Sequence, residues 1–436
     1  MNIPFTKYTL DNGLDVLIHE DHSLPIVAVN VWYHVGSKNE VPGRTGFAHL
    51  FEHLMFEGSQ HYDRGYFHPL QEAGAALNGS TNADRTNYWE VVPSNALDLA
   101  LWMESDRMGY LLPALTEAKF SNQRDVVLNE RRQNYENRPY GLAGMAIVSA
   151  MYPADHPYHW LTIGAAEDVR AAHLDDVKAF FQRYYHPANA SLTLAGDIDP
   201  EMGILLADEY FGEVPAGQKP APLTIAAPPP PEAEVKLVLE DRVELPRLYM
   251  AWHSPALFAD GDAELDLVAE VLAGGKTSRL YRALVYEQRI ATEVAASQNS
   301  RELGSFFQIV ATAAPGRTLA EVERAIVKEI GVLLDRGPTA LELERCLAQA
   351  EAHFLFRLQT VGGFGGKSDQ LNAYNVFLGD PGYFSRDLDR YRNATPWQLR
   401  AAAIKHLQPA SRVVLSVVPR GRVALALTGS RPVAVS

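Results

Sequence analysis

The sequence predicts an α+β protein, made of two homologous α/β-sandwich halves that a proline-rich linker joins. Residues 216–233 indicate the linker, because Pro228–Pro231 lies among Ala, Gly and Thr in a run that favours extended chain. This segment divides the 436 residues into a first half, 1–215, and a second half, 234–436, each of single-domain size. Strands grouped with long helices are typical of a sheet that packs on one layer of helices.

Two local matches indicate that the halves are copies of one another. The segment His49–Phe56 lies over Leu265–Leu272 at an offset of 216 residues. Towards the other end of each half, His186–Ala188 lies over Gln408–Ala410 at an offset of 222, and an apolar strand follows both. Two similar offsets at opposite ends of a half rarely arise by chance, so we expect the same fold twice.

The elements of the first half can be predicted in chain order. Asn12-Gly13 accepts positive φ and predicts a hairpin turn between strands at residues 5–10 and 14–19. An apolar run predicts a central strand over Ile26–Val35. The other expected elements are a helix at 46–56, strands at 76–80 and 86–93, helices at 95–111, 116–137 and 174–185, and a strand at 191–195. A core helix is expected at 339–358 of the second half.

Composition excludes several classes of protein. Lys and Arg number 39 and Asp and Glu number 53, so the formal net charge is −14. This charge argues against nucleic-acid binding, which needs a basic surface, and favours cationic substrates. A single cysteine, Cys346, excludes an internal disulfide framework, a cysteine-based zinc finger and an iron–sulfur cluster. Any structural metal must therefore be held by His and carboxylates.

Neither a membrane span nor a leader is expected. The sequence has no run of 18 or more apolar residues, so we expect no membrane interaction. Met1–Lys7 lacks the basic and apolar regions of a secretory leader. We therefore expect a cytoplasmic protein, or a periplasmic one if a leader has been removed.

The most specific motif is His49-x-x-Glu52-His53. Positions i, i+3 and i+4 share one face of a helix, so the two imidazoles can hold one zinc ion. The carboxylate between them can then reach a water molecule on that ion. H-x-x-E-H is the reversal of H-E-x-x-H and a signature of zinc proteases. A simpler interpretation is that His49 and His53 are partly buried structural histidines and that Glu52 is a helix-face charge.

A zinc ion of this kind needs a third protein ligand and keeps a fourth position for water. Glu130 is the candidate, because Phe120, Val127 and Glu130 follow at i, i+7 and i+10 on the apolar stripe of the 116–137 helix. A carboxylate that faces inward must be paired or coordinated. The spacing and helical context together favour zinc catalysis.

The segment His49–Ser59, with Glu130 77 positions beyond His53, resembles the pitrilysin/insulinase family of zinc peptidases. The duplicated halves make it most similar to the bacterial and mitochondrial-processing-peptidase branch. This resemblance implies that His49, His53 and Glu130 hold one Zn²⁺ per chain, with Glu52 as general base. It also implies a metalloendopeptidase whose two subunits close a chamber around peptides.

Residues 77–82 resemble the edge strand of the family, on which a peptide substrate adds as a further strand. Asn78, with Gly79 beside it, is the best candidate for a substrate contact. The alternative for Asn78 is a residue that flanks a turn.

Three positions depart from the family pattern. Gln123 stands where the family usually has a Glu near the ligands. Because Gln is neutral, we expect the orientation of the ligands or the zinc affinity to differ from that of the family. Family members also supply an Arg and a Tyr, seven residues apart, from the second half, whereas this chain has Val285 and Thr292. Arg279 and Tyr286 have that spacing but lie six positions early, and we interpret them as a coincidence.

These departures lead to a hypothesis about partners. The second-half helix also lacks metal ligands, with Leu265, Val268 and Ala269 at the equivalent places. We therefore expect a heterodimer in which a homologous zinc-free subunit supplies the Arg/Tyr pair, with a homodimer as the alternative. Other possible functions are a non-catalytic structural or assembly subunit of this fold, or a zinc hydrolase that acts on something other than peptides.

The segment Gly365-Gly366-Lys367-Ser368 is close to a phosphate-binding loop but does not match one. That motif needs a Gly where the chain has Val361. We interpret Gly362–Gly366 as a flexible loop that faces the peptide chamber.

Overall fold

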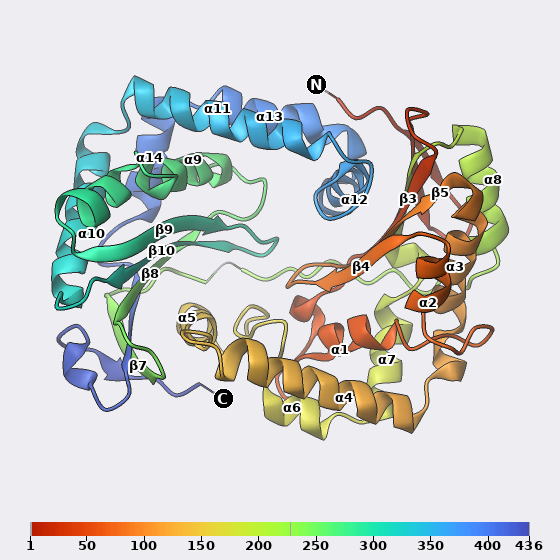
Figure 1. Cartoon of the computed structure of the whole chain (residues 1–436), viewed down its shortest axis with the longest axis horizontal. Coiled ribbons are helices and arrows are strands. Elements are labelled where there is room, and N and C mark those ends of the chain that lie inside the picture. The colour runs from red at the N-terminus through yellow and green to blue at the C-terminus, as the bar shows by residue number, and fades with distance from the viewer. Residues whose placement is uncertain (1, 227, 436) are drawn as a thin grey trace. The chain divides into compact units, whose positions relative to one another are not determined.

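The computed structural model describes residues 2–226 and 228–435, which form two compact units (Figure 1). The first unit consists of the residues up to Glu130, Trp160–Leu223 and His353–Arg386. The second consists of Arg131–His159, Thr224–Ala352 and the residues from Asp387 onwards. Each unit therefore contains one segment from the opposite side of the proline-rich run.

A six-stranded sheet forms the centre of the first unit. Its strands are β1 (Thr6–Thr9), β2 (Asp15–Glu20), β3 (Ile26–Tyr33), β4 (Ala76–Thr81), β5 (Thr86–Pro93) and β6 (Ala190–Gly196). They lie in the order β1-β2-β6-β3-β5-β4, and only the β2–β6 pair is parallel. The strand β4 is therefore at the edge, with a neighbour on one side only.

The second unit repeats this sheet. Its strands are β7 (Val235–Asp241), β8 (Arg247–Ser254), β9 (Ala291–Asn299), β10 (Ser305–Ala313), β11 (Val413–Pro419) and β12 (Arg431–Pro432). The order β12-β7-β11-β8-β10-β9 reproduces five strands of the first sheet, including the parallel pair, here β7 with β11. The two sheets differ in the sixth strand, because β12 is parallel to its neighbour whereas β1 is antiparallel. The predicted α+β fold with duplicated halves is confirmed.

Helices cover both faces of the first sheet (Figure 1). The helices of this unit are α1 (Phe47–Leu54), α2 (Phe67–Glu72), α3 (Leu97–Ala114), α4 (Glu117–Arg131), α6 (Ala166–Ala171), α7 (Leu174–Tyr184), α8 (Pro200–Phe211) and α12 (Lys367–Leu378). The helices α3 and α8 pack on one face, where α3 contacts β3 and β5 and α8 contacts β2. The opposite face is covered by α12, which contacts β6 and β3.

The contact between α12 and the sheet is polar. The carboxylate of Asp369 accepts hydrogen bonds from Trp32 Nε1 at 2.9 Å and Asn87 Nδ2 at 3.2 Å. Asn372 Nδ2 donates to the carbonyl of Asn30 at 2.8 Å, and Asn372 Oδ1 accepts from Thr193 Oγ1 at 2.8 Å. These groups are buried, so the hydrogen bonds offset the desolvation cost of a polar interface.

The second sheet is covered in a corresponding way. Its helices are α5 (Ala143–Met151), α9 (Asp262–Ala273), α10 (Leu319–Arg336), α13 (Phe384–Arg392) and α14 (Pro396–His406), and α11 (Ala340–Arg357) begins in this unit. The helices α10 and α14 contact β8, and α9 contacts β9. The helix α5, from the first half of the sequence, contacts β11 and β8 as α12 contacts the first sheet.

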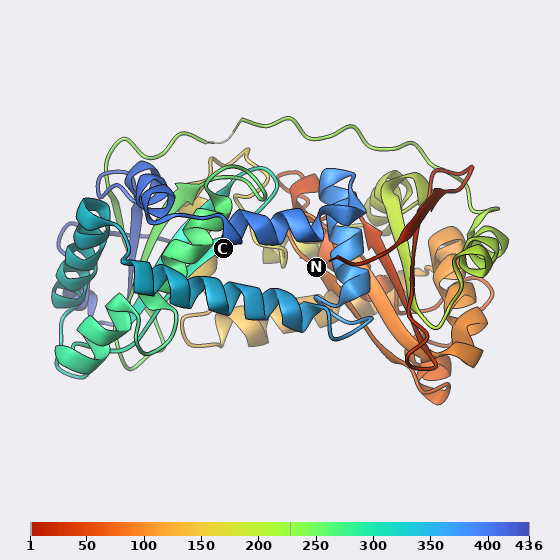
Figure 2. The ribbon, with the colours of Figure 1, turned by 90° about the horizontal axis from the view of Figure 1, so that it is seen from above.

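Most predicted elements are found close to their expected bounds. Gly13 has φ 87 and closes the β1–β2 hairpin with a hydrogen bond from its amide to the Leu10 carbonyl at 2.8 Å. One helix is shorter than predicted: α4 ends at Arg131, and Arg132–Glu136 forms a π-helical turn. The described residues between α8 and β7 include an extended run without a helix or strand (Figure 2). In the described part of the chain, no helix combines the length and hydropathy needed to cross a bilayer.

Candidate metal centre

The helix α1 presents the motif because its other residues are held in the core. Leu50, Phe51 and Leu54 are fully buried, so His49, Glu52 and His53 occupy the remaining face. Rings stack on the buried side, where Phe51 and Phe181 lie 5.4 Å apart between centroids.

The buried carboxylate of Glu40 fixes the start of α1. Its two oxygens accept hydrogen bonds from the amides of Gly46 and Ala48, both at 2.9 Å. Trp160 Nε1 donates to the same carboxylate at 3.0 Å. Burial raises the pKa of Glu40 to about 8, although these three donors favour the ionised form.

The three predicted ligands lie together. Glu130 Oε2 is 3.6 Å from His49 Nε2 and 3.3 Å from His53 Nε2. The two imidazole planes are nearly perpendicular, at 87°, with centroids 4.9 Å apart. Phe120 and Val127 are buried on α4, as the predicted stripe requires.

This donor set fits a zinc ion. Zinc bound tetrahedrally at about 2.0–2.1 Å separates its ligand atoms by roughly 3.3 Å, close to both observed distances. Two imidazole nitrogens and a carboxylate oxygen form a three-ligand set typical of catalytic zinc. Burial lowers the pKa of His49 to about 4, so this imidazole is neutral, the form that binds a metal.

The other two ionisable groups of the motif have raised pKa values. Burial raises the pKa of Glu52, and a hydrogen bond from Thr81 on β4 and the neighbouring His53 oppose that shift. Burial alone would lower the pKa of His53, but the hydrogen bond to Glu130 and the charge of Glu52 raise it. The sequence analysis did not predict the contact between Thr81 and Glu52, because only the folded chain brings the two residues together.

Gln123 lies next to the ligands, as the sequence analysis expected. It hydrogen-bonds to His53, and its Nε2 donates to Glu57 Oε1. A Glu at position 123 would place a second carboxylate against Glu57. The neutral amide therefore suits this neighbour, a relationship that the sequence alone did not reveal.

Asn78 and Gly79 lie on the edge strand β4, near α1. The amide of Gly79 donates to Asn78 Oδ1 at 2.8 Å, so it points away from β5 and towards the free edge. A Cβ at Gly79 would come within 3.1 Å of the Phe56 ring, just beyond α1. The expected substrate contact of Asn78 and Gly79 stays a prediction.

The second-unit residues considered for the missing Arg/Tyr pair have other contacts. Arg279 Nε lies 2.6 Å from Glu342 Oε1, and Arg279 also donates to the Gly337 carbonyl at 2.9 Å. Tyr286 is 75% exposed. Val285 packs against the hydrophobic core, and Thr292 Oγ1 is 3.5 Å from the Thr312 carbonyl.

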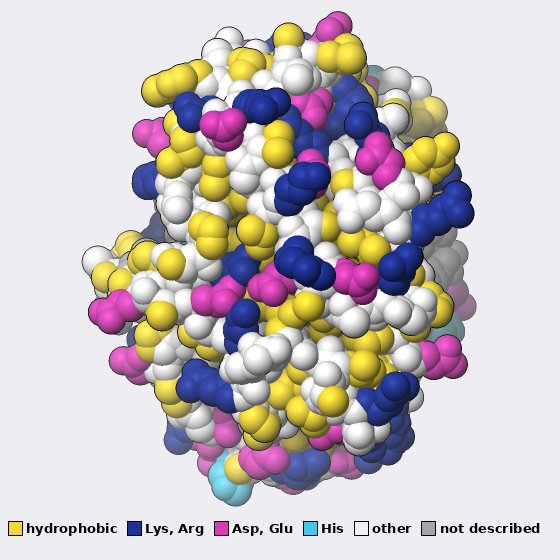
Figure 3. All heavy atoms as spheres, turned by 90° about the vertical axis from the view of Figure 1, so that its left-hand side faces the viewer, with side chains coloured by type: hydrophobic (Ala, Val, Ile, Leu, Met, Phe, Trp, Pro, Cys, Tyr) yellow, Lys and Arg dark blue, Asp and Glu magenta, His cyan; other side chains and the backbone are white. Residues whose placement is uncertain are grey.

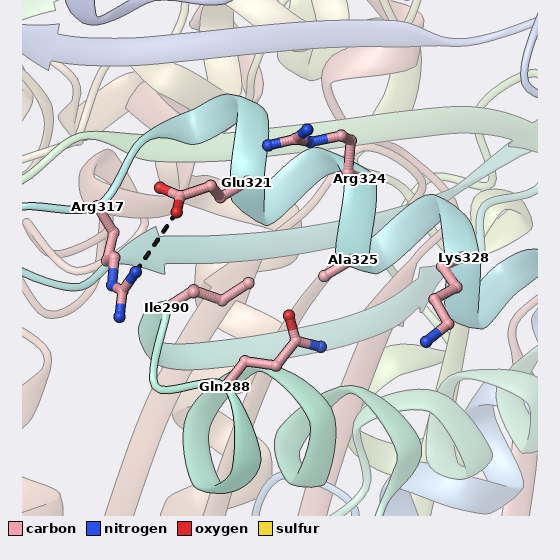
Figure 4. A pocket seen from close by; sticks show the side chains of 7 residues that line it. All are labelled: Gln288, Ile290, Arg317, Glu321, Arg324, Ala325 and Lys328. Carbon is pink, nitrogen blue, oxygen red and sulfur yellow. Dashed lines mark hydrogen bonds and ion pairs between the residues drawn. The ribbon is translucent and has the colours of Figure 1, made fainter.

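A hollow of about 450 Å³ in the second unit is a different kind of site (Figure 4). Its lining residues are Gln288, Ile290, Arg317, Glu321, Arg324, Ala325 and Lys328. Arg317 lies 3.4 Å from Glu321, and none of the seven is a His, a Cys or a hydroxyl nucleophile. On the face shown in Figure 3, acidic and basic side chains are interspersed, and the expected preference for cationic substrates stays a prediction.

The chain is similar in sequence to one family of known proteins. Residues 15–157 match the family model described as Insulinase (Peptidase family M16), and residues 171–350 match Peptidase M16 inactive domain. The zinc protease PqqE of Helicobacter pylori is 29% identical over 385 residues, 87% of this chain and 86% of that protein.

Solved structures share the fold over nearly the whole chain. A protease from Helicobacter pylori superposes with a TM-score of 0.88 and 26% identity, covering 95% of this chain and 100% of that one. A peptidase M16 inactive domain from Pseudomonas fluorescens superposes with a TM-score of 0.84 and 19% identity, covering 99% and 100%. The second likeness concerns the fold alone.

Proposed function

The chain belongs to peptidase family M16, the insulinase family, and on that premise we propose that it is a zinc-dependent metalloendopeptidase. The observation that supports this most is the cluster of His49, His53 and Glu130, with Glu52 on the same helix and in contact with the edge strand. One Zn²⁺ per chain would be held by these three ligands.

Each residue has a defined role in this mechanism. Bound zinc would lower the pKa of a water molecule and polarise the scissile carbonyl. Glu52 takes the proton from the attacking water and delivers it to the leaving amine nitrogen. The free edge of β4 aligns the peptide through backbone hydrogen bonds, with Asn78 and Gly79 as contacts. Thr81 holds the carboxylate of Glu52 towards that edge.

The test is zinc content and cleavage of a mixed fluorogenic peptide library, measured on the same preparations. We expect the wild-type chain to bind one zinc ion. Cleavage is measured for the chain alone and for the chain mixed with its proposed partner subunit. Glu52→Gln should keep the zinc and lose cleavage by about 10²–10⁴-fold. Glu72→Gln is the matched control, because Glu72 lies on α2 with an exposed side chain. A chain that binds no zinc would overturn the proposal.

The proposal extends to a partner subunit. Arg279 is bound to Glu342, and the two positions that align with the Arg/Tyr pair hold Val285 and Thr292. We therefore assign the pair to a homologous zinc-free subunit in a heterodimer. Full cleavage by the zinc-loaded chain alone, with a homodimer mass in solution, would overturn this assignment while leaving the peptidase function in place.

A further inference from the structure

A groove of about 420 Å³ lies on the first sheet, beyond the metal centre. It is bounded by residues from β3, β4 and β5, by the turn before β3, and by Gln359–Gly363, the segment before α12. Trp89, Val91 and Ile26 give it apolar walls. None of the metal ligands lines it, so it is a separate feature of the same unit.

The groove lies at one end of the edge strand β4. Ala76 lines it and pairs with Val91 of β5, while Asn78 pairs with Trp89. Directly paired residues in antiparallel strands place their side chains on the same face. The groove is therefore on the face of β4 that carries the side chains of Ala76 and Asn78. At the other end of β4, Thr81 contacts Glu52.

The segment before α12 forms one wall of the groove because it approaches the sheet closely. A Cβ at Gly362 would lie 2.5 Å from Val91 Cγ2 and 2.7 Å from Ala28 Cβ, so only glycine fits there. Leu24 lines the groove and is 59% exposed. Phe364, next in the chain to the lining residue Gly363, is 51% exposed, and its ring centroid lies 5.4 Å from that of Trp89. Exposed apolar side chains at the rim of an apolar groove are typical of a binding site.

Charge inside the groove is neutralised. Asp21 is its acidic lining residue, and Asp21 Oδ2 lies 2.8 Å from Lys367 Nζ at the start of α12. Ser23 Oγ donates to the same carboxylate at 2.6 Å. Because this charge is already paired, the groove favours an apolar side chain over a basic one.

A peptide on the free edge of β4 would reach this groove. The Gly79 amide points outward, and alternation along the strand points the amides of Leu77 and Thr81 the same way. In an antiparallel arrangement the peptide runs from Thr81 towards Ala76. The peptide residue opposite Ala76 then lies three places C-terminal to the residue opposite Gly79, with its side chain on the groove face.

We propose that the groove binds an apolar side chain of the peptide substrate, on the C-terminal side of the scissile bond. The chemistry is at the Thr81 end of β4, about 10–16 Å from Ala76 at roughly 3.3 Å per residue, so the bound side chain belongs about three to five residues beyond the cleaved bond. This inference rests on the proposed peptidase function, and it gives that function a preference for substrates with Leu, Met or Phe at this position.

The first experiment measures peptide binding without cleavage. Zinc-loaded Glu52→Gln protein is titrated into fluorescein-labelled ten-residue peptides, with either Ser or one Leu in an otherwise identical Ser/Ala host. We expect the Leu peptide to bind about tenfold more tightly, from burial of one side chain. Equal affinity of the two peptides would overturn the proposal.

Two substitutions then locate the effect, each with a control matched in chemistry. Ala76→Phe fills the groove from the edge strand, and Thr6→Phe adds the same ring to β1 of the same sheet. Leu24→Asp charges the rim, and Leu205→Asp makes the same change at an exposed leucine of α8. The groove variants should abolish the Leu preference and the controls should keep it. A preference that survives Ala76→Phe would place the side chain elsewhere.

Cleavage of the same peptides by the wild-type chain, with its partner if one is needed, separates the two proposals. Cleavage about three to five residues before the Leu supports both. Cleavage with no dependence on the Leu position rejects the groove and leaves the peptidase function standing. Selective binding that Ala76→Phe abolishes, without cleavage by any preparation, rejects the peptidase function and supports the groove as a peptide site.

Discussion

Glu130 Oε2 lies 3.3 Å from His53 Nε2, although 77 residues separate them in the sequence. Glu130 is carried by α4, on which Phe120 and Val127 are buried. We expect Glu130→Gln to weaken zinc binding at least about 100-fold, because a neutral amide replaces the only anionic ligand of the three. Competition with a chelator measures this, and unchanged affinity would show that Glu130 is not a ligand.

Glu40 is expected to support zinc binding without contacting the metal. Glu40→Ala leaves the amides of Gly46 and Ala48 without their acceptor, at a cost of about 1–3 kcal/mol. Because both His ligands are on α1, the zinc affinity should fall as well. Glu321→Ala at the start of α10 is the control: it removes a capping box in the other unit, so it should reduce stability and leave zinc affinity unchanged.

The Gln123–Glu57 pair predicts a rescue. Gln123→Glu should place two carboxylates together and lower the stability of the metal-free protein by about 1–2 kcal/mol. The double variant Gln123→Glu/Glu57→Gln exchanges the two groups and should restore most of that loss. Denaturant unfolding of both single variants and the double variant gives the coupling energy, and a coupling near zero would show that the two side chains act independently.

Lowering the pH should destabilise the second unit, because His253 is buried as the neutral imidazole and becomes protonated. Burial lowers the pKa of His253 to about 4, with an opposing hydrogen bond to Met151 and a further lowering by His156. The unfolded chain binds this proton near pH 6.5, so the stabilising contribution is complete above that pH and is lost as the pH falls towards 4. Between pH 7 and pH 5 the loss is about 2 kcal/mol.

Unfolding of the metal-free protein at both pH values tests this, because zinc binding is itself pH-dependent. His253→Gln should reduce the pH dependence, and His68→Gln, at an exposed histidine, should leave it unchanged. An identical pH dependence in His253→Gln and wild type would contradict the assignment.

Arg279 is expected to contribute to folding stability and not to peptidase activity. Arg279→Met breaks its contacts with Glu342 and the Gly337 carbonyl and should cost about 2 kcal/mol. The double variant Arg279→Met/Glu342→Met removes both charges and should fold with peptidase activity close to wild type, measured with the partner present if one is needed. Loss of cleavage by a folded double variant would place Arg279 in the active site after all.

The sequence predicts the halves well because their patterns are local. Apolar strands, the Asn12-Gly13 turn and two matching offsets are readable without tertiary information, and the duplicated sheets agree with them. The positions of α5 and α12 could not be read this way. The inward face of α12 carries Asp369 and Asn372, so hydropathy places that face in water although it is buried against the sheet.

The candidate site shows the same division. A fixed spacing predicts His49, Glu52 and His53 as site residues, and an apolar stripe predicts Glu130. Thr81 and Glu57 are ordinary surface residue types with no distinctive spacing, and they join the site only because β4 and the end of α1 pack together.

The placement of α12 has a consequence for synthesis on the ribosome. The strands of the first sheet are complete once residue 196 has been translated, but the helix that covers one of its faces begins at Lys367. During the intervening stretch of translation that face, with buried Asn30 and Trp32 awaiting partners, has no intramolecular cover from α12. Its final packing must therefore occur late, and a nascent chain stalled before α12 is the form most in need of a chaperone.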